Sequence, residues 1–210
     1  MPKRVIAVSR TIGAGGEAVG HMVSKQLGWR YVDDEIVSAA AKSAGVKADL
    51  VADAEKRRGI LLQFVDGLGE PGPRIGGLMF TGAEESERSE DFRALIREAV
   101  KKTAELGEVV IVAHAASLAL AGKEDVLRVL ITASSEMRVW RVADQAKVPL
   151  AKATEIVEHS DAARADYIKR FYDIDTELST HYDLIVNTDA VSTEEAARAV
   201  TSLVSEIAER

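Results

Sequence analysis

Short runs of apolar residues recur along this chain and are separated by longer stretches in which apolar residues return every three or four positions. Within the runs, apolar and polar residues do not alternate, which is typical of strands that are buried on both faces. The pattern therefore predicts five buried strands, over residues 4–9, 29–33, 108–113, 127–132 and 183–188.

The stretches between these runs predict helices over residues 17–27, 36–44, 92–106, 135–146, 150–169 and 193–209, with a break near Ser160. Strands that alternate with helices form right-handed crossovers, which build an α/β fold with a helix-covered parallel sheet. Ligands bind such sheets beyond the carboxyl ends of the strands. Candidate site residues therefore lie in segments 9–20, 33–35, 113–117, 132–138 and 187–189.

A long insert, residues 36–107, separates the second predicted strand from the third. Its centre, residues 67–90, is rich in glycine, proline and acidic residues, and long loops of this kind in compact domains are usually functional or mobile. Apolar stretches at residues 60–65 and 75–80 lie beside the acidic part of this loop. They fit packing against a second copy in a homo-oligomer, and they fit a local core equally well.

The composition is that of a soluble globular protein, with 47% hydrophobic and 29% charged residues among 210. This length suits a single domain over residues 1–210. The absence of cysteine excludes disulfides, thiolate metal sites and a cysteine nucleophile. The apolar runs are far shorter than the roughly 20 residues of a membrane-spanning helix, and the first residues lack a signal peptide's apolar segment. We therefore expect a cytoplasmic location.

The net charge of −7 disfavours nucleic acid and anionic membranes as partners, because both favour a basic protein surface. A small anionic substrate is still compatible with this charge where local cations face it. We therefore expect small-molecule partners, without nucleic acid or membrane.

The stretch "SRTIGAGGEAVG", residues 9–20, joins the first predicted strand to the first helix. A phosphate-binding loop needs such a turn, because backbone N–H groups and the positive end of a helix then face the phosphate. In the pattern G-x-x-x-x-G-K-[ST], the second glycine is Gly15. The first glycine, the lysine and the hydroxyl residue are replaced by Arg10, Gly16 and Glu17. The stretch is either a phosphate site without its lysine or a glycine-rich turn without a ligand.

A third interpretation is a dinucleotide-binding turn. Gly13, Gly15 and Ala18 match the fingerprint G-x-G-x-x-[GA], and Asp33 follows Gly13 by 20 residues, where a ribose-binding acid belongs. Against this interpretation, residues 10–12 intervene between the strand and the first glycine, as they do in a P-loop.

Three segments resemble the bacterial cytidylate kinases and the cytidylate kinase-like family. They are "VLRVLITASSEMRVWRV" (126–142), "YDLIVNTDAVSTEEAARAV" (182–200) and the opening "SRTIGAGGEAVGHMVSKQLGWRYVDDEIV", in a branch where glycine commonly replaces the loop lysine. The resemblance spans residues 4–205. It implies a P-loop NTPase-like three-layer sandwich with a five-stranded parallel sheet, a monophosphate-binding insert (about 36–107) and a short lid (about 142–170).

The resemblance also implies an activity: transfer of the γ-phosphoryl group of ATP to a pyrimidine monophosphate, with Mg²⁺ held mainly through the nucleotide phosphates and no metal-ligating residues assigned. The implied catalytic arginines are Arg138, Arg141 and Arg164. The implied phosphate-binding residues are Gly13, Ala14, Gly15, Gly16, Glu17 and Ala18, to which Arg10 is added as a substitute for the lysine charge. The substrate-binding residues are Asp33, His114, Asp161 and Arg164.

Each of these residues also has a purely structural interpretation. Arg138 and Arg141 can pair with Glu136 or Asp144 on the same helix. Asp161 can cap the start of a helix, since aspartate is a preferred N-cap residue. Likewise, His114 can be a hydrogen-bonded histidine at a strand end, and the acids that begin at Asp33 can favour the start of a helix.

The departures from the family pattern support a second function. Glu17 would repel a bound phosphate, and Ala18 stands where a threonine hydroxyl would help to bind Mg²⁺. The alternative to a kinase is therefore a catalytically weak or inactive nucleotide-binding or regulatory protein on the same fold. An oxidoreductase with a dinucleotide cofactor is the third candidate.

Overall fold

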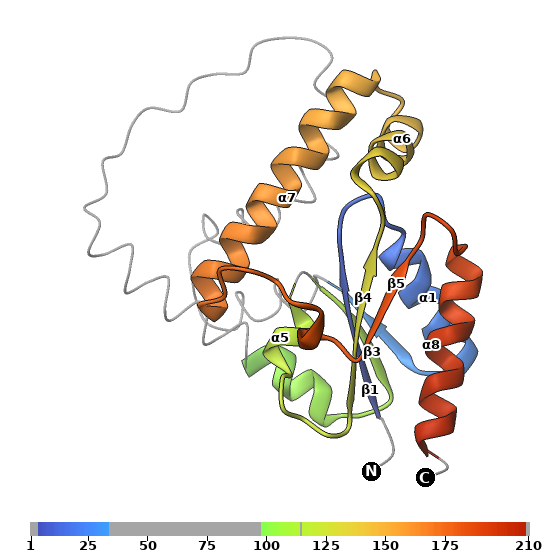
Figure 1. The fold of residues 1–210 in the computed structure, drawn as a ribbon. Coiled ribbons are helices and arrows are strands. Elements are labelled where there is room, and N and C mark those ends of the chain that lie inside the picture. The colour runs from blue at the N-terminus through green and yellow to red at the C-terminus, as the bar shows by residue number, and fades with distance from the viewer. Residues whose placement is uncertain (1–3, 34–97, 114, 209–210) are drawn as a thin grey trace.

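The computed structural model describes residues 4–33, 98–113 and 115–208. The predicted helix 36–44, the loop 67–90 and both apolar stretches beside it lie outside the described residues. Five parallel strands form one sheet in the order β2-β3-β1-β4-β5 (Figure 1). They are β1 Val5–Arg10, β2 Arg30–Val32, β3 Val109–Val112, β4 Val126–Thr132 and β5 Leu184–Asn187. The predicted five-stranded parallel sheet is confirmed.

This strand order decides against the dinucleotide-binding turn. In the usual dinucleotide-binding fold the second strand lies beside the first, so that an acid at its end reaches the ribose. Here β3 lies between β1 and β2, and Asp33 therefore follows a strand that is one place removed from the glycine-rich loop. The Gly13-x-Gly15-x-x-Ala18 match is a coincidence of glycine spacing.

Helices cover the sheet on both faces (Figure 1). They are α1 Gly16–Leu27, α5 Ala116–Ala119, α6 Ser135–Ala146, α7 Leu150–Tyr172, α8 Thr193–Ala208 and a helical segment at residues 98–105. A 3-10 turn, η1 Ser179–His181, precedes β5. Among the described residues, no helix has the length and apolar character needed to cross a membrane.

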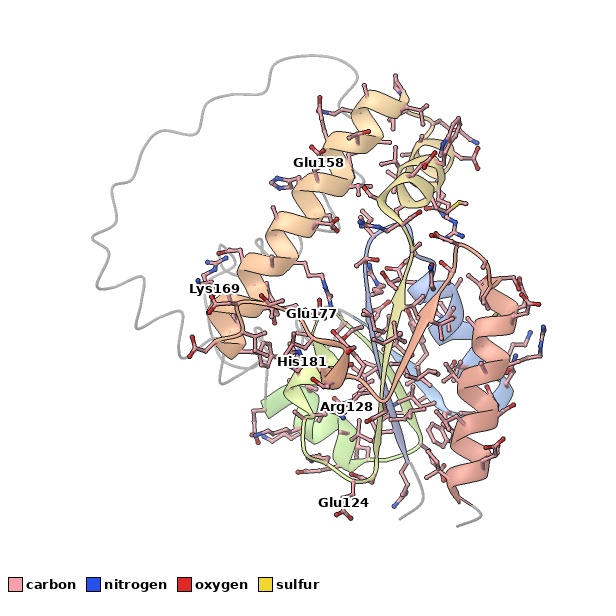
Figure 2. All side chains as sticks on the ribbon, viewed as in Figure 1. Glu124, Arg128, Glu158, Lys169, Glu177 and His181 are labelled. Carbon is pink, nitrogen blue, oxygen red and sulfur yellow. The ribbon has the colours of Figure 1, made fainter. Side chains whose placement is uncertain are left out.

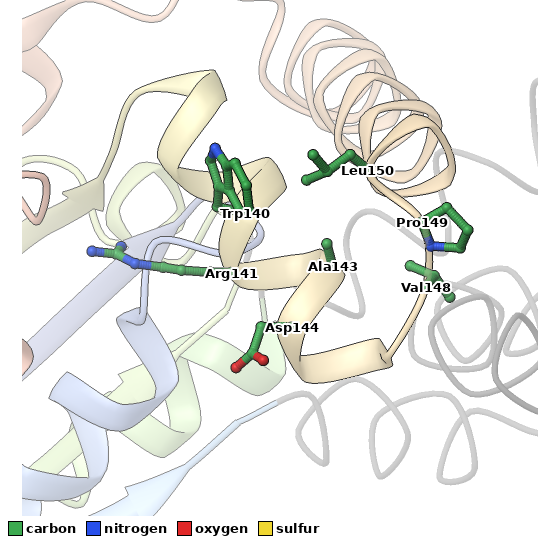
Figure 3. A pocket seen from close by; sticks show the side chains of 7 residues that line it. All are labelled: Trp140, Arg141, Ala143, Asp144, Val148, Pro149 and Leu150. Carbon is green, nitrogen blue, oxygen red and sulfur yellow. The ribbon is translucent and has the colours of Figure 1, made fainter.

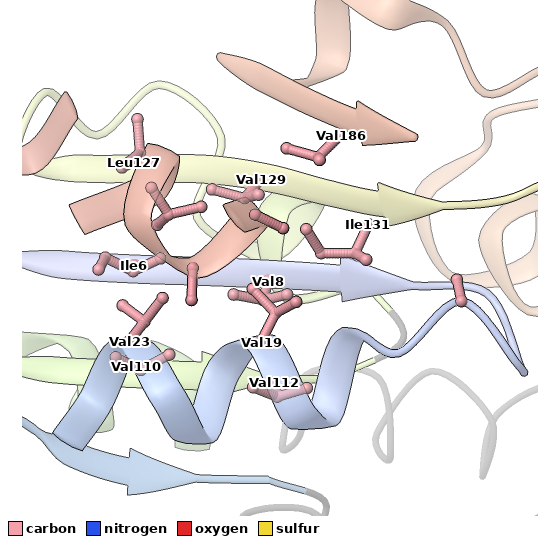
Figure 4. Close-up of a cluster of buried hydrophobic side chains, with 14 of the residues drawn as sticks. Ile6, Val8, Val19, Val23, Val110, Val112, Leu127, Val129, Ile131 and Val186 are labelled. Atoms are coloured by element: carbon pink, nitrogen blue, oxygen red, sulfur yellow. The ribbon is translucent and has the colours of Figure 1, made fainter. Parts of the chain in front are cut away.

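Successive residues of β1 point to opposite faces of the sheet and supply two separate cores. Ile6 and Val8 pack with Val19 and Val23 of α1 and with residues of α8, as Figure 4 shows. On the other face, Val5 and Ala7 pack with the helical segment 98–105 and with α5. Burial on both faces explains why the strands are apolar throughout.

Helices α6 and α7 form a hairpin that has a small core of its own. Val142, Ala153, Ile156 and Val157 are buried in it, and Ile12 of the loop after β1 packs against it. The first loop of the sheet and the hairpin are therefore in direct contact.

The predicted break near Ser160 is wrong, because α7 runs without interruption from Leu150 to Tyr172. Its buried residues, among them Ala153, Ile156, Arg164 and Ile168, keep a helical spacing on both sides of Ser160. The polar residues at 160 and 161 occupy an interior turn of a continuous amphipathic helix. They do not begin a new one.

Candidate functional site

The loop after β1 joins the carboxyl edge of the sheet to the start of α1. Gly13 and Gly15 have φ angles of 76° and 81°, in the left-handed region that a residue with a Cβ atom adopts at a cost. Gly15 is the N-cap of α1, and no side chain within the described residues caps this helix. The first turn of α1 therefore presents backbone N–H groups without intrahelical acceptors, the arrangement that binds anions.

Arg10, the last residue of β1, lies over the start of α1. Its Nη2 atom is 2.5 Å from Oε1 of Glu17, and its side chain is only 15% exposed, against 61% for Glu17. A Cβ atom built on Gly16 would lie 2.5 Å from Cβ of Arg10. The side chain of Arg10 thus runs directly along the backbone of Gly16.

Arg141, on α6, binds the loop itself. Its Nη1 donates to the Gly13 carbonyl (3.2 Å) and to Oγ1 of Thr188 (2.8 Å), and its Nη2 donates to the Thr188 carbonyl (2.6 Å). Thr188 is buried after β5, and its hydroxyl donates to the Ala14 carbonyl (2.9 Å). Arg141 therefore connects α6, the loop and the end of β5, and the alternative interpretation, a pairing with Glu136 or Asp144, is wrong.

Arg138 and Asp161 form a two-pronged ion pair between α6 and α7. Nη1 and Nη2 of Arg138 lie 2.8 and 2.7 Å from the two carboxylate oxygens of Asp161. Arg138 is 6% exposed, whereas the side chain of Asp161 is 42% exposed. The structural interpretations of both residues are therefore wrong: Arg138 does not pair with Glu136 or Asp144, and Asp161 is not a helix cap.

Arg164 ties α7 to the end of β1. Its Nη1 donates to the Arg10 carbonyl at 3.1 Å. On the other side, Nε and Nη2 donate to the carboxylate of Glu177 at 3.2 and 2.5 Å, and Nη2 also donates to the Tyr182 hydroxyl at 3.3 Å. Figure 2 shows Glu177 between α7 and the sheet. Asp161 thus binds Arg138 of α6, whereas Arg164 binds the end of β1 and Glu177.

The positive charge of this edge is matched by carboxylates of the same chain. Three of the predicted arginines have an acidic partner: Glu17 for Arg10, Asp161 for Arg138 and Glu177 for Arg164. An anionic ligand must therefore compete with a carboxylate for each of these guanidinium groups. The acceptor of Arg141 is instead a set of uncharged oxygens.

The remaining predicted residues are placed only in part. Asp33 follows β2 directly, so it lies at the same edge of the sheet as the loop. Ala14 is buried, Ala18 is exposed, and His114 lies outside the described residues.

Two contributors, Thr188 and Glu177, were not singled out from the sequence. Thr188 falls in the segment 187–189, which the fold rule about strand ends includes. Glu177 lies in an irregular segment whose sequence carries no pattern that points to Arg164.

The described residues do not fit a magnesium ion held by the protein. Ala18 has no hydroxyl group, and the carboxylate of Glu17 is bound to Arg10. In the part of the chain that the structure describes, no group of three or more histidine, aspartate or glutamate side chains is arranged to hold a metal ion.

A cavity of about 640 Å³ opens between α6 and the start of α7. Figure 3 shows Trp140 and Leu150 beside it, while the guanidinium of Arg141 points away from Pro149 and Leu150. Trp140 is 57% exposed. Arg141 and Asp144 also line the cavity, so both apolar and charged side chains bound it.

Comparison with solved structures shows that the fold is that of the P-loop kinases. An uncharacterized protein from Eubacterium ventriosum superposes with a TM-score of 0.68 at 15% identity, covering 97% of this chain and 99% of the other. Shikimate kinase from Acinetobacter baumannii has a TM-score of 0.52 at 13% identity, covering 97% and 94%. A gluconokinase from Sinorhizobium meliloti has a TM-score of 0.53 at 12% identity, covering 99% and 94%.

Sequence comparison finds proteins named cytidylate kinase. The protein from Sulfurisphaera tokodaii is 21% identical over 196 residues, which cover 93% of this chain and 92% of that protein. The protein from Desulfurococcus amylolyticus is 32% identical over 103 residues, which cover 48% and 54%. The model of the cytidylate kinase-like family matches residues 5–190, most of the chain and all of the described strands. This chain belongs to the cytidylate kinase-like family.

Proposed function

We propose that this protein is a phosphotransferase that moves the γ-phosphoryl group of ATP to a pyrimidine nucleoside monophosphate. An oxygen of the monophosphate forms the new bond to the γ-phosphorus, and the bond between this phosphorus and the β-phosphate oxygen breaks in line. The electron pair of the broken bond leaves on ADP. Such transfer depends mainly on positioning and on neutralising phosphate charge.

The observation that carries the proposal is the attachment of two predicted arginines to the loop. Arg141 donates to the Gly13 carbonyl, and Arg164 donates to the Arg10 carbonyl. Guanidinium groups from the α6–α7 hairpin are thereby held at the end of β1, near the start of α1, whose first N–H groups have no intrahelical acceptors. Donor phosphates that bind over these N–H groups would lie within the reach of both cations.

The residues divide into two sets in this proposal. The loop, residues 13–18 together with Arg10, would bind the donor phosphates, and Arg138, Arg141 and Arg164 would offset the charge that is transferred. The acceptor nucleotide would lie against Asp33, His114, Asp161 and Arg164. Mg²⁺ would enter with the nucleotide, held mainly through its phosphates, and would supply positive charge that offsets part of the phosphate charge.

We expect the natural chain to phosphorylate slowly. The loop has no lysine, and the carboxylates of Glu17, Asp161 and Glu177 must release their arginines before these can meet a phosphate. Each release opposes binding, because charge-assisted hydrogen bonds between arginine and carboxylate are among the stronger ones in proteins.

The test is release of ADP by the full chain from ATP and Mg²⁺ in the presence of CMP, dCMP, UMP or AMP in turn. We expect turnover with a pyrimidine monophosphate and a reduction of at least about tenfold in Arg141→Ala, since one cation can contribute 10³-fold or more in such reactions. Arg170→Ala is the matched control, because Arg170 lies on α7 and pairs with Asp166 in the same helix. Equal losses in the two variants, or turnover with none of the four monophosphates, would contradict the proposal.

The same ion pairs favour a second candidate, a protein that binds a nucleotide without turning it over. Titration calorimetry with ATP and CMP separates the two candidates. Binding of one nucleotide in the absence of ADP release supports the second, whereas binding of both together with turnover supports the first.

A further inference from the structure

Arg10 and Gly16 share one space at the start of α1. The Cβ atom of Arg10 lies 2.5 Å from the place that a Cβ atom of residue 16 would take, and its Cδ and Cγ atoms lie 3.2 and 3.4 Å from that place. Real Cβ atoms do not approach another carbon so closely. A side chain at position 16 would therefore require Arg10 to shift from its present place.

The two positions have exchanged their residue types relative to the P-loop pattern. In G-x-x-x-x-G-K-[ST], the first position is glycine and the lysine follows the second glycine. In this chain, Arg10 stands at the first position and Gly16 at the lysine position. Both arrangements contain a cation. In this chain its side chain is attached at the end of the strand, whereas in the pattern it is attached at the start of the helix.

We infer that Arg10 is the phosphate-binding cation of this loop, and that Glu17 occupies its guanidinium until a polyphosphate displaces the carboxylate. This rests on the proposed function, in which the loop binds the donor triphosphate. It names the residue that replaces the lysine, and it identifies an internal competitor for the ligand.

The setting of Arg10 suits this role. Its side chain is largely buried, and its backbone carbonyl is held by Arg164, so the guanidinium is positioned before any ligand arrives. Its Nη2 atom pairs with the side chain of Glu17, a residue of the first turn of α1, whose N–H groups have no intrahelical acceptors. A phosphate over these N–H groups would meet the same guanidinium.

The setting of Glu17 suits displacement. Its carboxylate is 61% exposed, and its side chain can rotate into water without disturbing the core. A carboxylate at this point resembles a phosphate oxygen in charge and in hydrogen-bonding capacity, so it satisfies the guanidinium in the free protein. A triphosphate brings more negative charge and additional contacts with the N–H groups, which favours the exchange.

The first test exchanges the two residues back to the pattern. Binding of ATP and of inorganic tripolyphosphate to the full chain is measured by calorimetry. Arg10→Gly is expected to weaken both by about 10- to 100-fold, as expected for the loss of a hydrogen bond from a charged group. Arg10→Gly combined with Gly16→Lys is expected to regain most of this loss. Glycine is required at position 10, because an alanine Cβ would still meet the new lysine.

The second test removes the competitor. Glu17→Gln is expected to tighten tripolyphosphate binding by about 2- to 5-fold, because a partly exposed ion pair contributes up to about 1 kcal/mol. The control for the loss of one carboxylate is Glu206→Gln. Glu206 lies near the C-terminal end of α8, where it is exposed and distant from the loop. Equal effects of the two changes would overturn the role of Glu17.

Three results would overturn the inference on Arg10: wild-type affinity in Arg10→Gly, a folded double variant that binds no better than Arg10→Gly, or a wild-type chain that binds neither ATP nor tripolyphosphate. Circular dichroism establishes that the variants are folded.

These binding measurements do not require turnover, so the inference on Arg10 can be tested separately from the proposed function. ATP binding that depends on Arg10 without phosphorylation of any monophosphate would support the inference and refute the proposed function. Turnover that is unaffected by Arg10→Gly would support the proposed function and refute the inference on Arg10.

Discussion

The guanidinium of Arg138 and the carboxylate of Asp161 face each other in a two-pronged pair that joins α6 to α7, with N–O distances of 2.8 and 2.7 Å. The arginine is buried, whereas the aspartate is partly exposed. A polar contact of this kind between two helices orients them, because its two hydrogen bonds fix both distance and plane. Removing the carboxylate of Asp161 would therefore leave the guanidinium of Arg138 buried without its charged partner.

Asp161→Asn is expected to lower the free energy of unfolding by about 1–3 kcal/mol. Removing one partner of a fully buried pair costs about 3–5 kcal/mol, and the exposure of Asp161 reduces this. Urea unfolding is the measurement. Asp166→Asn, on the same helix and paired with the half-exposed Arg170, is expected to change stability by less than about 1 kcal/mol. Equal losses of unfolding free energy in the two variants would show that the ion pair with Arg138 stabilises the chain no more than an exposed pair does.

Arg164→Lys is expected to destabilise the chain by about 1–3 kcal/mol although the charge is kept. A lysine ammonium group cannot donate to the Arg10 carbonyl and to both oxygens of Glu177 in the way that the planar guanidinium does. Thermal unfolding compares this variant with Arg170→Lys, which makes the same exchange on an exposed face. A melting temperature of Arg164→Lys close to that of the control would contradict the prediction.

Gly13→Ala is expected to destabilise the loop by more than the backbone angle alone explains. Gly13 and Gly122 both have positive φ angles, 76° and 79°, at which alanine costs about 1–2 kcal/mol. A Cβ atom at Gly13 would also lie 2.8 Å from the Arg138 carbonyl oxygen, whereas none of the described atoms lies within 4 Å of one at Gly122. The difference between the two alanine variants in urea unfolding, about 1–3 kcal/mol, measures this steric contact. No difference would mean that the loop moves away from α6 freely.

The start of α8 is expected to make stability depend on pH. The Ser192 N–H donates to Oε2 of Glu195 at 2.9 Å, and the Glu195 N–H donates to the Ser192 hydroxyl oxygen at 3.2 Å, which is a capping box. The backbone hydrogen bond from Ser192 and then its side-chain hydrogen bond lower the pKa of Glu195 below its ordinary value of 4.5. A carboxyl whose pKa is lowered on folding contributes stability above its unfolded pKa and loses it as the pH falls through the folded value.

Glu195→Gln tests this dependence, because glutamine keeps a hydrogen-bond acceptor but does not titrate. Melting temperatures are measured from about pH 6 to about pH 3. The wild-type chain is expected to lose stability relative to Glu195→Gln as the pH falls across this range. Parallel pH curves for the two proteins would contradict the lowered pKa.

The sheet and most helices followed from the sequence because their residues are ordered by local rules. Strands such as Val109–Val112 are apolar on both faces and too short to be amphipathic helices of ordinary length. Ser134 is the N-cap of α6, and its hydroxyl accepts from the Met137 N–H. Two features of the described helices were not predicted. The short helix α5, Ala116–Ala119, was missed, and a break was expected near Ser160 in α7, where two polar residues suggested a helix start. The buried residues on both sides show that tertiary packing decided against this local signal.

The ion pairs of the candidate site could not be predicted in the same way. Arg138 meets a carboxylate 23 positions away, and the hydrogen bond from Arg164 to the Arg10 carbonyl spans 154 positions. A surplus of acids near each arginine offered several partners on the same helix, among them Glu136 and Asp144. The actual partners are chosen by how α6, α7 and β1 pack, which no local pattern encodes.

Ile12 couples the conformation of the loop after β1 to that of the α6–α7 hairpin. Its side chain packs with the core of α6 and α7, while its neighbours form the turn whose N–H groups face the proposed phosphates. A change in the angle of the hairpin must therefore repack Ile12 and alter the turn, and a change in the turn must repack the hairpin. Occupancy of either part biases the other by the same free energy, so the affinities for two molecules bound there would be reciprocally linked.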